Sequence, residues 1–556
     1  MHANLSKKSK LKAIFKLFIL LFALTTTARA EKSPKYEVRA VWLTTIGGID
    51  WPHSYSAEAQ KQELGHILDQ LKAANVNTIL VQARVRGTTI YPSAMEPWDG
   101  CITGTPGRSP GYDPLQLVID ESHRRGMECH AWIVTIPVGK WNKIGCQQLR
   151  RKYPKLIKKI GDEGYMDPEN VLTADYLARI CTEVTRRYDV DGIHLDYIRY
   201  PEKWRLKVSR QQGREHITRI VRTIHQAVKQ EKPWVKLSCS PIGKHDDLVR
   251  YSSHGWNART TVCQDAQAWM RDGLMDMLFP MMYFQGNNFF PFALDWQEHS
   301  YGRIVVPGLG IYMLHPHEKN WPLEVVEREM QVTRQYGLGH CYFRSKFLTD
   351  NVKGVYDFAC RFDCAPSLVP PMTWACTTPP SAPKALQLKG NRLSWQAADD
   401  FSGGDYLLYN IYASRTFPVD ISDPANLVAT RLRATSATVM PSGYYYAVTA
   451  QNRYGLEGPA ATFGDAPNTH SEEKKSAMKL YRTALVPLPK KPVTLDAEYL
   501  IIENLHGQQM GVFPWRGRHL NLSALPDGIY RFRSLGRKGR THIVGTFALR
   551  KSKKLH

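Results

Sequence analysis

The sequence predicts an α/β fold, a (β/α)8 TIM-like barrel followed by two small all-β sandwich domains. Three observations support this prediction. Strand-like and helix-like segments alternate from residue 39 to about residue 358, a segment rich in Pro, Thr and Ser follows at 366–383, and only strand-like segments come after it. We therefore expect the barrel over residues 31–365 and the sandwich domains over 384–465 and 481–556.

Short β-branched runs, each followed by an amphipathic helical pattern, carry the barrel prediction. An open, doubly wound sheet is the alternative. Such a sheet rarely reaches eight units, and the first turn of this chain lacks a glycine-rich phosphate-binding sequence. The expected strands are Arg39–Thr45, Thr78–Arg84, Glu128–Val134, Gly192–Ile198, Lys236–Ile242, Met277–Phe284, Arg303–Ile311 and Gly339–Arg344.

Long connections follow the second, third and fifth expected strands, at residues 85–113, 135–170 and 243–265. Barrel enzymes carry their sites on the loops at the carboxyl ends of the strands, so we expect a cleft there. The expected helices include Ala57–Ala74, Pro114–Arg125, Thr173–Arg187, Glu215–Gln230 and Pro322–Tyr336.

The two β-domains follow linkers at residues 366–383 and 466–480. Trp395 and the Tyr-rich sequence ending "YYYAVTAQNRYGLEG" resemble a fibronectin type III sandwich, a module that spaces or binds. The last domain has turn signals at Pro526-Asp527-Gly528 and Gly536.

The first thirty residues have the pattern of a secretory signal peptide. Five lysines precede the apolar run Leu17–Leu24, and Ala28-Arg29-Ala30 supplies small residues for cleavage. No later stretch is long and apolar enough to cross a bilayer. We expect an exported, monomeric protein, periplasmic, on the cell surface or secreted.

Basic residues are in excess, with a formal charge of +23, and they gather at the C-terminal end. Residues 466–556 hold 17 lysines and arginines against six acidic residues. Such a surface is able to bind anionic envelope polymers. Nucleic acid is not expected as a partner, because the chain is exported and contains no nucleic-acid-binding motif.

All ten cysteines lie between Cys101 and Cys376, and none forms a C-x-x-C pair. Cys129, Cys239 and Cys341 fall inside strand-like runs and are expected to be buried. Histidines and acids show no ligand spacing, so no metal is expected, and no cofactor motif is present.

The strongest chemical signal is "VDGIHLDYIRYP" at residues 190–201. His194 and Asp196 alternate with apolar residues and therefore share one face of a strand. A carboxylate on the lumen face is costly unless it is solvated, paired or functional. Asp196 lies near the carboxyl end of the strand, where barrel active sites are found. An ion pair between Asp196 and an arginine such as Arg199 is the structural alternative.

Several segments occur in the order typical of one family: "EVRAVWLTT", "YPSAMEPWDG", "GYDPLQLVIDESHRRGMECHAW", "DGIHLDYIRYP" and "DMLFPMMYF". Over roughly residues 35–360 the chain resembles the glycosyl-hydrolase-like ten domain. The resemblance implies a secreted or envelope glycosidase barrel, with some relatives acting on peptidoglycan glycan strands. Relatives commonly follow the His-Ala-Trp of the third strand with Asn-Pro and a basic residue. This chain instead continues from Trp132 with Ile-Val-Thr-Ile-Pro, so its contacts to the sugar are expected to differ from those of its relatives.

Glycoside hydrolysis generally uses two carboxyl groups, and Asp196, ionised, is the first that we expect. Glu96 and Asp246 are catalytic candidates for the second, and Asp50 is a further possibility. Trp98, next to Glu96, would reduce the hydration of that carboxyl. The residues expected to bind substrate are Asp50, Trp51, Arg84, Arg86, His130, Trp132, His194, Arg199 and Tyr283.

The sequence therefore predicts a secreted glycoside hydrolase that cleaves a polysaccharide, with peptidoglycan glycan strands as the favoured substrate. A non-catalytic carbohydrate-binding barrel of the cell envelope is the alternative, and an enzyme of other chemistry on the same barrel is a third. The first two differ in whether a second carboxyl faces Asp196 across the cleft.

Overall fold

A computed structural model describes residues 33–251, 255–440, 443–462, 479–489, 497–504, 509–516, 518–536 and 541–551. The expected signal peptide and most of the second linker lie outside these residues. The chain divides into two compact units, residues 1–464 and 465–556. In the described part of the chain, no helix is both long enough and apolar enough to span a membrane.

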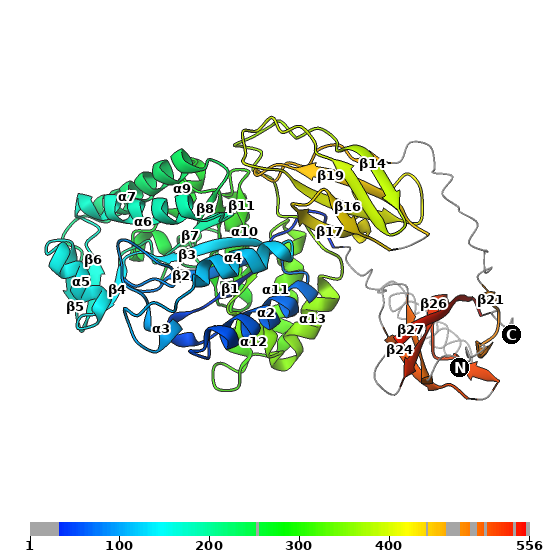
Figure 1. Ribbon diagram of the computed structural model, residues 1–556. Helices are drawn as coiled ribbons and strands as arrows, with labels where there is room; N and C mark the ends of the chain where they lie inside the picture. The colour runs from blue at the N-terminus through cyan, green and yellow to red at the C-terminus, as the bar shows by residue number, and fades with distance from the viewer. Residues whose placement is uncertain are drawn as a thin grey trace, which may run out of the picture. The chain divides into compact units, whose positions relative to one another are not determined.

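The predicted barrel is confirmed. Its parallel strands begin with β1 (Arg39–Leu43), β2 (Thr78–Arg84), β3 (Glu128–Val134), β7 (Gly192–Asp196) and β8 (Lys236–Cys239). Figure 1 shows these strands at the centre, with α2 (Ala57–Ala73) and α4 (Pro114–Arg124) outside them. The alternation of buried strands with amphipathic helices thus gives the expected layers.

Two neighbouring strands of the barrel, the sixth and the seventh, are interrupted. The sixth consists of β9 (Met277–Leu278) and β10 (Met281–Met282), and the seventh of β11 (Ile304–Val305) and β12 (Gly308–Leu309). Pro280 and Pro307 lie in the two gaps, where a proline cannot donate a ladder hydrogen bond. β9 pairs with β8 and β11, while β10 pairs with β12, and β13 (His340–Tyr342) closes the barrel against β1.

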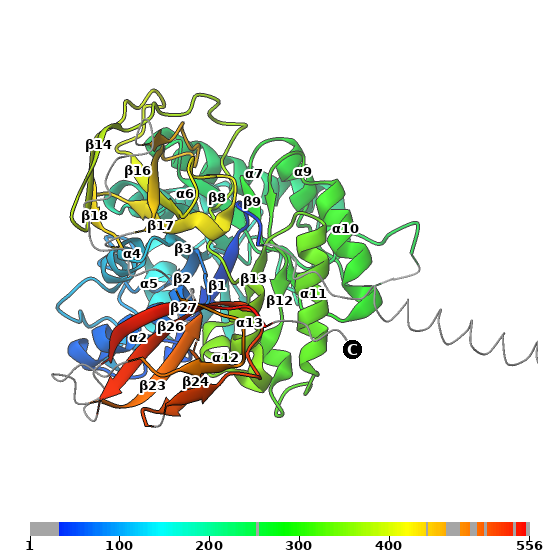
Figure 2. The same cartoon turned by 90° about the vertical axis from the view of Figure 1, so that its right-hand side faces the viewer.

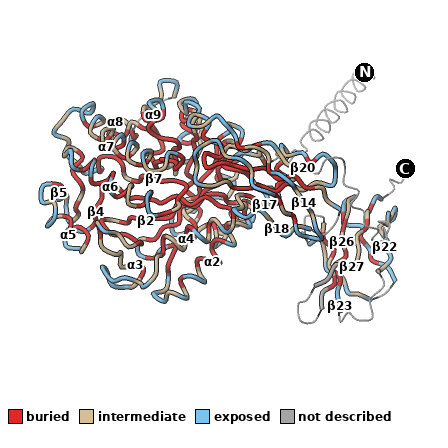
Figure 3. Tube along the Cα trace, turned by 45° about the horizontal axis from the view of Figure 1, so that its top comes forward, coloured by how far each residue is buried: buried red, intermediate tan, exposed pale blue. Residues whose placement is uncertain are grey.

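Helices cover the barrel on its outside. They are α6 (Val171–Arg187), α7 (Arg210–Glu231), α9 (Ala266–Arg271), α10 (Phe290–Glu298), α11 (Leu323–Gln335) and α13 (Val355–Phe362), in addition to α2 and α4. Figure 2 shows α9, α10 and α11 outside β9, β12 and β13. The strands are buried along their length, and exposed residues gather in loops and on outer helix faces (Figure 3).

The loops at the carboxyl ends of the strands carry small elements of their own. The loop after β2 holds α3 (Gly100–Thr103). The loop after β3 holds α5 (Ile144–Lys152) and a small sheet of β4 (Pro137–Lys140), β6 (Glu163–Met166) and β5 (Ile157–Ile160). The long connections predicted after these strands are therefore folded, which gives the barrel a shaped mouth.

The amino ends of the strands are closed by buried ion pairs. The Arg431 guanidinium, on β17 (Leu427–Leu432), lies 3.2 Å from Glu128 and also pairs with Asp191. Lys236 Nζ lies 2.9 Å from the same Glu128 oxygen, Oε1, that Arg431 contacts. The following β-segment therefore supplies a cation to two carboxylates of the barrel, which would otherwise be buried without enough positive charge.

Beyond the barrel the described residues form small, mainly antiparallel sheets. One group has a three-stranded sheet of β14 (Lys384–Lys389), β15 (Arg392–Gln396) and β18 (Ser436–Thr438). Its four-stranded sheet has the order β17, β16 (Leu408–Ser414), β19 (Tyr445–Gln451) and β20 (Ala461–Thr462), and Trp395 is buried against Tyr409. The second unit has a five-stranded sheet in the order β21 (Lys479–Tyr481), β27 (Thr541–Leu549), β26 (Gly528–Gly536), β23 (Ala497–Asn504) and β24 (Gln509–Pro514). It also has the strand pair β22 (Leu485–Pro487) and β25 (His519–Asn521). The all-β character is confirmed, while the fibronectin type III resemblance and the domain boundaries stay predictions.

Candidate active site

Asp196 ends β7 and is held by three donors. Its Oδ1 accepts hydrogen bonds from Ser240 Oγ at 2.9 Å and from the Tyr197 backbone N–H at 2.8 Å. Its Oδ2 accepts from Trp132 Nε1 at 3.1 Å. Only 7% of Asp196 is exposed. These contacts fix the carboxyl group at the mouth of the barrel, at the carboxyl end of its strand.

Burial is the main influence on Asp196 and raises its pKa above the ordinary value for aspartic acid. Ser240, the Arg199 guanidinium and the Tyr197 amide act in the opposite direction but do not cancel it. The next residue, Tyr197, has φ of 53°, in the left-handed region. Such a conformation is uncommon for a residue with a side chain, and it ends the strand directly after the carboxyl group.

Arg199 links Asp196 to a second carboxyl group. Its guanidinium lies 4.4 Å from the centre of the Tyr197 ring and donates to Glu202 at 2.8 Å. Burial tends to raise the pKa of Glu202, but the charge and the hydrogen bond of Arg199, together with smaller local contributions, lower that pKa overall. Trp256, on the loop after β8, lies 5.7 Å above the same guanidinium and is 45% exposed.

An aromatic group forms another part of the mouth. Tyr283, after β10, stacks on Phe343 with ring centres 5.2 Å apart and meets Tyr312 edge-on at 5.6 Å. Burial raises the pKa of Tyr283 well above its ordinary value, and Asp196 adds to the effect. Tyr283 is therefore protonated and lies within electrostatic range of Asp196.

The two histidines predicted to bind substrate lie below the mouth, inside the barrel. Trp42 Nε1 donates to His194 Nε2 at 3.2 Å, so the proton of the ring is on Nδ1, which lies 3.0 Å from Ser238 Oγ. Burial lowers the pKa of His194 well below its ordinary value, and the ring is neutral. His130 is fully buried and pairs with Glu128, toward the amino ends.

Glu96 and Arg84 form an enclosed ion pair. Arg84 donates to both Glu96 oxygens, at 2.8 and 2.6 Å, and Tyr176 Oη donates to Oε1 at 2.9 Å. Arg84 also donates to the backbone carbonyl of Thr135 at 2.9 Å. Neither charged side chain is exposed. This geometry joins the loops that follow β2 and β3, and it leaves the Glu96 carboxyl without an open side.

The remaining acidic candidates are held in ion pairs of their own. Asp50 accepts from the Thr44 N–H at 2.9 Å and pairs with Arg344. Burial raises the pKa of Asp50, against the influence of Arg344. Trp51 is fully buried and donates to a backbone carbonyl of α2, so neither face of its ring is open. Asp246 lies on the loop after β8 and pairs with Arg259 at 2.7 Å.

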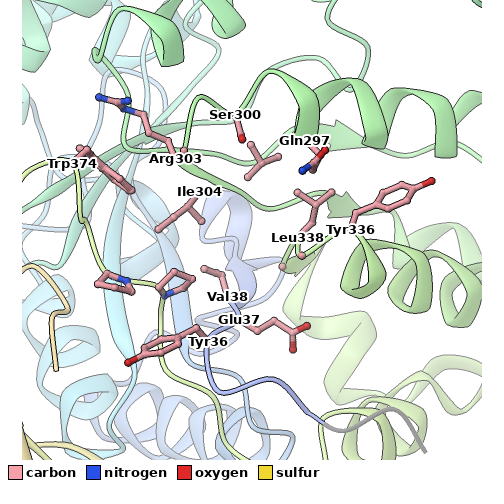
Figure 4. A pocket seen from close by; sticks show the side chains of 16 residues that line it. Tyr36, Glu37, Val38, Gln297, Ser300, Arg303, Ile304, Tyr336, Leu338 and Trp374 are labelled. Atoms are coloured by element: carbon pink, nitrogen blue, oxygen red, sulfur yellow. The ribbon is translucent and has the colours of Figure 1, made fainter. Parts of the chain in front are cut away.

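Among the predicted binding residues, Arg86 lines a cavity. The cavity has a volume of about 610 Å³ and lies between the loops that follow β1, β2 and β3. Arg86 pairs with Glu163 at 3.2 Å, and its charge reaches Tyr197. A smaller cavity of about 200 Å³ lies at the amino ends of the strands, between Arg303, Trp374 and Tyr36 (Figure 4). It is far from the chemistry expected of a barrel, which belongs to the opposite end.

Ser240, Tyr197 and Glu202 did not emerge from the sequence as site residues. Ser240 follows β8 directly, and a polar residue at the carboxyl end of a barrel strand is the pattern that could have identified it as a site residue. Glu202 lies three residues after Arg199, a spacing that permits an ion pair. The structure brings Asp196, Trp132, Arg199 and Tyr283 together, whereas Glu96, Asp50 and Asp246 each pair with an arginine of their own.

The chain is similar in sequence to members of a known protein family. Residues 37–211 and 203–314 match the family model described as glycosyl hydrolase-like 10. Glycosyl hydrolase YngK of Bacillus subtilis (strain 168) is 29% identical over 422 residues, which cover 69% of this chain and 82% of YngK. Glycosyl hydrolase DigH of Escherichia coli (strain K12) is 30% identical over 287 residues, 44% of this chain and 65% of DigH. The glycoside hydrolase domain of PgaB (BpsB) from Bordetella bronchiseptica aligns with a TM-score of 0.42 at 13% identity, over 59% of this chain and 99% of that domain.

Proposed function

The chain belongs to the glycosyl hydrolase-like 10 family, and from that premise we propose that it hydrolyses glycosidic bonds in a polysaccharide at the mouth of its barrel. The observation that carries the proposal is the Asp196 carboxyl group, buried at the end of β7 and oriented by Ser240, Trp132 and the Tyr197 amide. A carboxyl group held this rigidly, with one oxygen bonded only by an indole, is suited to react with a bound sugar.

Glu202 is our proposal for the second carboxyl group. Arg199 and Tyr197 are in electrostatic range of both Asp196 and Glu202. Their environments move the two pKa values in opposite directions, upward for Asp196 and downward for Glu202. Such divergence supports a division of labour between an acid and a base.

We propose Asp196 as the proton donor to the leaving oxygen. Oδ1 is occupied by two donors, so the proton would be carried on Oδ2. Glu202, held ionised by Arg199, would activate water or attack the anomeric carbon. This differs from the ionised Asp196 that the sequence suggested, because burial favours the protonated form of that group.

The substrate that we propose is more specific than the family assignment alone supplies. An envelope polysaccharide, with peptidoglycan glycan strands favoured, fits the signal-like first thirty residues and the basic C-terminal segment. The exposed Trp256 and the aromatic group at Tyr283 and Tyr312 support sugar binding, since aromatic rings pack on the apolar faces of sugars.

The test measures new reducing ends from peptide-free peptidoglycan strands and from a panel of neutral glycans. Asp196→Asn and Glu202→Gln are compared with wild type, with Asp246→Asn as an arm for the earlier candidate. Asp272→Asn serves as the matched control, since Asp272 is an exposed acid in the turn before β9, at the amino ends of the strands.

We expect at least a hundredfold loss for the Asp196 and Glu202 variants, about the lower end of what acid–base groups contribute, and none for Asp272→Asn. An aryl glycoside with a good leaving group needs no protonation, so Asp196→Asn should retain more activity on it than on the glycan. Binding of glycans without new reducing ends in any protein would support the non-catalytic barrel instead.

A further inference from the structure

The cavity between the loops after β1, β2 and β3 is a hollow next to the proposed active site, and we call it the β1–β3 pocket. Its volume of about 610 Å³ is in the range of small-molecule sites. It opens at the carboxyl ends of the strands, the end of the barrel that carries Asp196. The proposed reaction uses none of the residues that line it.

Glycines form much of the pocket wall, with six among its 19 lining residues. Gly47 and Gly48 have φ of 61° and 68°, and a side-chain carbon built on Gly48 would meet no atom within 4 Å. The wall above Gly48 is therefore open space beside bare backbone. Glycine at such positions lets a ligand approach the main chain closely.

Tyr55 forms an aromatic edge of the pocket and is 69% exposed. Its ring lies against Gly104, where an added side-chain carbon would come within 3.1 Å of the ring. One part of the ring is thus held in place by the backbone of the loop after β2, and the rest faces solvent. A flat, fixed and exposed ring is suited to carry the apolar face of a sugar.

Three cationic side chains line the same pocket. Arg86 pairs with Glu163 at 3.2 Å, and Lys140 pairs with Asp162 at 2.6 Å. Lys143 precedes α5, and within the described residues no carboxylate pairs with it. The one lining carboxylate, Asp99, is engaged by its own loop, accepting from Thr88 Oγ1 at 2.6 Å and from the Cys101 N–H at 2.8 Å.

Arg86 connects the pocket to the reacting group. Its charge lowers the pKa of Tyr197, which burial and the neighbouring Asp196 raise. Arg86 therefore lies within electrostatic range of Tyr197, the residue that follows Asp196, and a long glycan bound at Asp196 that passed Tyr197 would reach the pocket.

We propose that the β1–β3 pocket is a subsite for a sugar residue that bears a carboxylate, with Tyr55 under the sugar ring and Lys143 and Arg86 at the charged substituent. The inference rests on the proposed glycosidase function and gives it a substrate class, an acidic glycan. A phosphate or sulfate substituent would present the same oxygen chemistry, so the test separates these sources.

The substrates are peptide-free peptidoglycan strands, which carry carboxylates, and the same strands with their carboxyl groups converted to methylamides. A sulfated and a phosphorylated glycan serve as the alternative anions. The variants are Lys143→Gln, Tyr55→Ala and Tyr55→Phe. Lys319→Gln is the lysine control, on a loop of the same face, and Phe401→Ala is the aromatic control, at an exposed ring beyond the barrel.

We expect Lys143→Gln to lower kcat/KM on the carboxylated strands about tenfold, as for a lost hydrogen bond to a charged group, and to leave the amidated strands unaffected. Tyr55→Ala should lower kcat/KM about tenfold on both substrates, while Tyr55→Phe stays near wild type. Equal behaviour of Lys143→Gln and Lys319→Gln on both substrates would overturn the inference, as would a Lys143 effect confined to the sulfated or phosphorylated glycan.

Binding keeps the two proposals apart. Affinity for the carboxylated strands is measured by calorimetry in the Asp196→Asn background, where chemistry does not matter. If wild type cleaves no glycan but binding still depends on Lys143 and Tyr55, the pocket stands and the proposed hydrolase fails. If wild type cleaves the strands but neither residue affects binding or cleavage, the pocket inference fails alone.

Discussion

The Nε1 of Trp132 donates a hydrogen bond to Oδ2 of Asp196 across 3.1 Å, from β3 to the neighbouring strand β7. Because Oδ1 already accepts two bonds, this indole is the described protein group bonded to the oxygen that we propose to carry the reacting proton. The pairing of β3 with β7 thus positions the Trp132 indole, and the indole orients the Asp196 oxygen that would carry the proton.

Trp132→Phe removes this donor and keeps most of the ring. A donor favours the ionised carboxylate, so its loss should raise the pKa of Asp196 further. If Asp196 acts as the acid, activity falls as pH rises through that pKa, and the alkaline limb of the kcat/KM profile should move to higher pH. The measurement is the pH profile of kcat/KM against wild type, and an unmoved alkaline limb would argue against Asp196 as the acid.

Arg84→Met leaves the buried Glu96 without its partner. Breaking one side of a buried pair should cost about 3–5 kcal/mol in the free energy of unfolding. The double variant Arg84→Met/Glu96→Leu should recover much of that loss. Denaturant unfolding measures both. Retention of kcat in the double variant would identify Glu96 as structural, whereas a folded but inactive double variant would restore it as a catalytic candidate.

Arg431→Met tests the charges at the amino ends of the strands. Burial acts to raise the pKa of Glu128, but Lys236 and Arg431 outweigh it and lower it to about 2. A depressed pKa gives stability that is present above the unfolded value, near 4.5, and is lost as pH falls toward about 2. The free energy of unfolding of the variant should be lower than that of wild type by about 3 kcal/mol or more at pH 7. This difference in the free energy of unfolding should become smaller as the pH falls from 4.5 to 2.

Urea unfolding at a series of pH values measures this difference. Arg392→Met, at an exposed arginine of β15, is the control and should behave as wild type. A constant gap between Arg431→Met and wild type across that range would show that packing, and not charge, accounts for the loss.

Removal of residues 465–556 tests the basic second unit. These residues form a compact unit of their own, so the shortened chain should keep its kcat on soluble glycan fragments. Its retention on an anionic polymer should fall, and the difference should vanish at 1 M salt, where charges are screened beyond about 3 Å. Equal retention of both chains at low salt would remove the anionic-polymer role.

The sequence predicted the fold well where burial of an element is what produces its hydrophobic pattern. The bounds of β2 and β3 matched because a buried parallel strand reads as a continuous apolar run. The sixth and seventh strands were each predicted as one run, since hydrophobicity does not reveal that Pro280 and Pro307 divide their ladders.

The site was predicted less completely for a physical reason. Asp196 followed from its position on a strand, but its contact with Ser240 spans 44 residues of sequence and depends on how β7 and β8 align. Glu96 was a reasonable candidate from its loop, yet the bidentate contact with Arg84 comes from a side-chain direction that no local pattern encodes.

The prolines between β9 and β10 and between β11 and β12 leave one half of the barrel with shorter ladders than the other. Asp196 and Ser240 stand where β3, β7 and β8 pair in longer ladders, whereas Tyr283 and Tyr312 follow the interrupted strands. Local opening is easiest where backbone hydrogen bonds are fewest. Amide hydrogen exchange should therefore be faster in the short strands β10, β11 and β12 than in β3 and β7. We therefore expect a bound glycan to shift the aromatic side of the mouth more than the reacting carboxyl group.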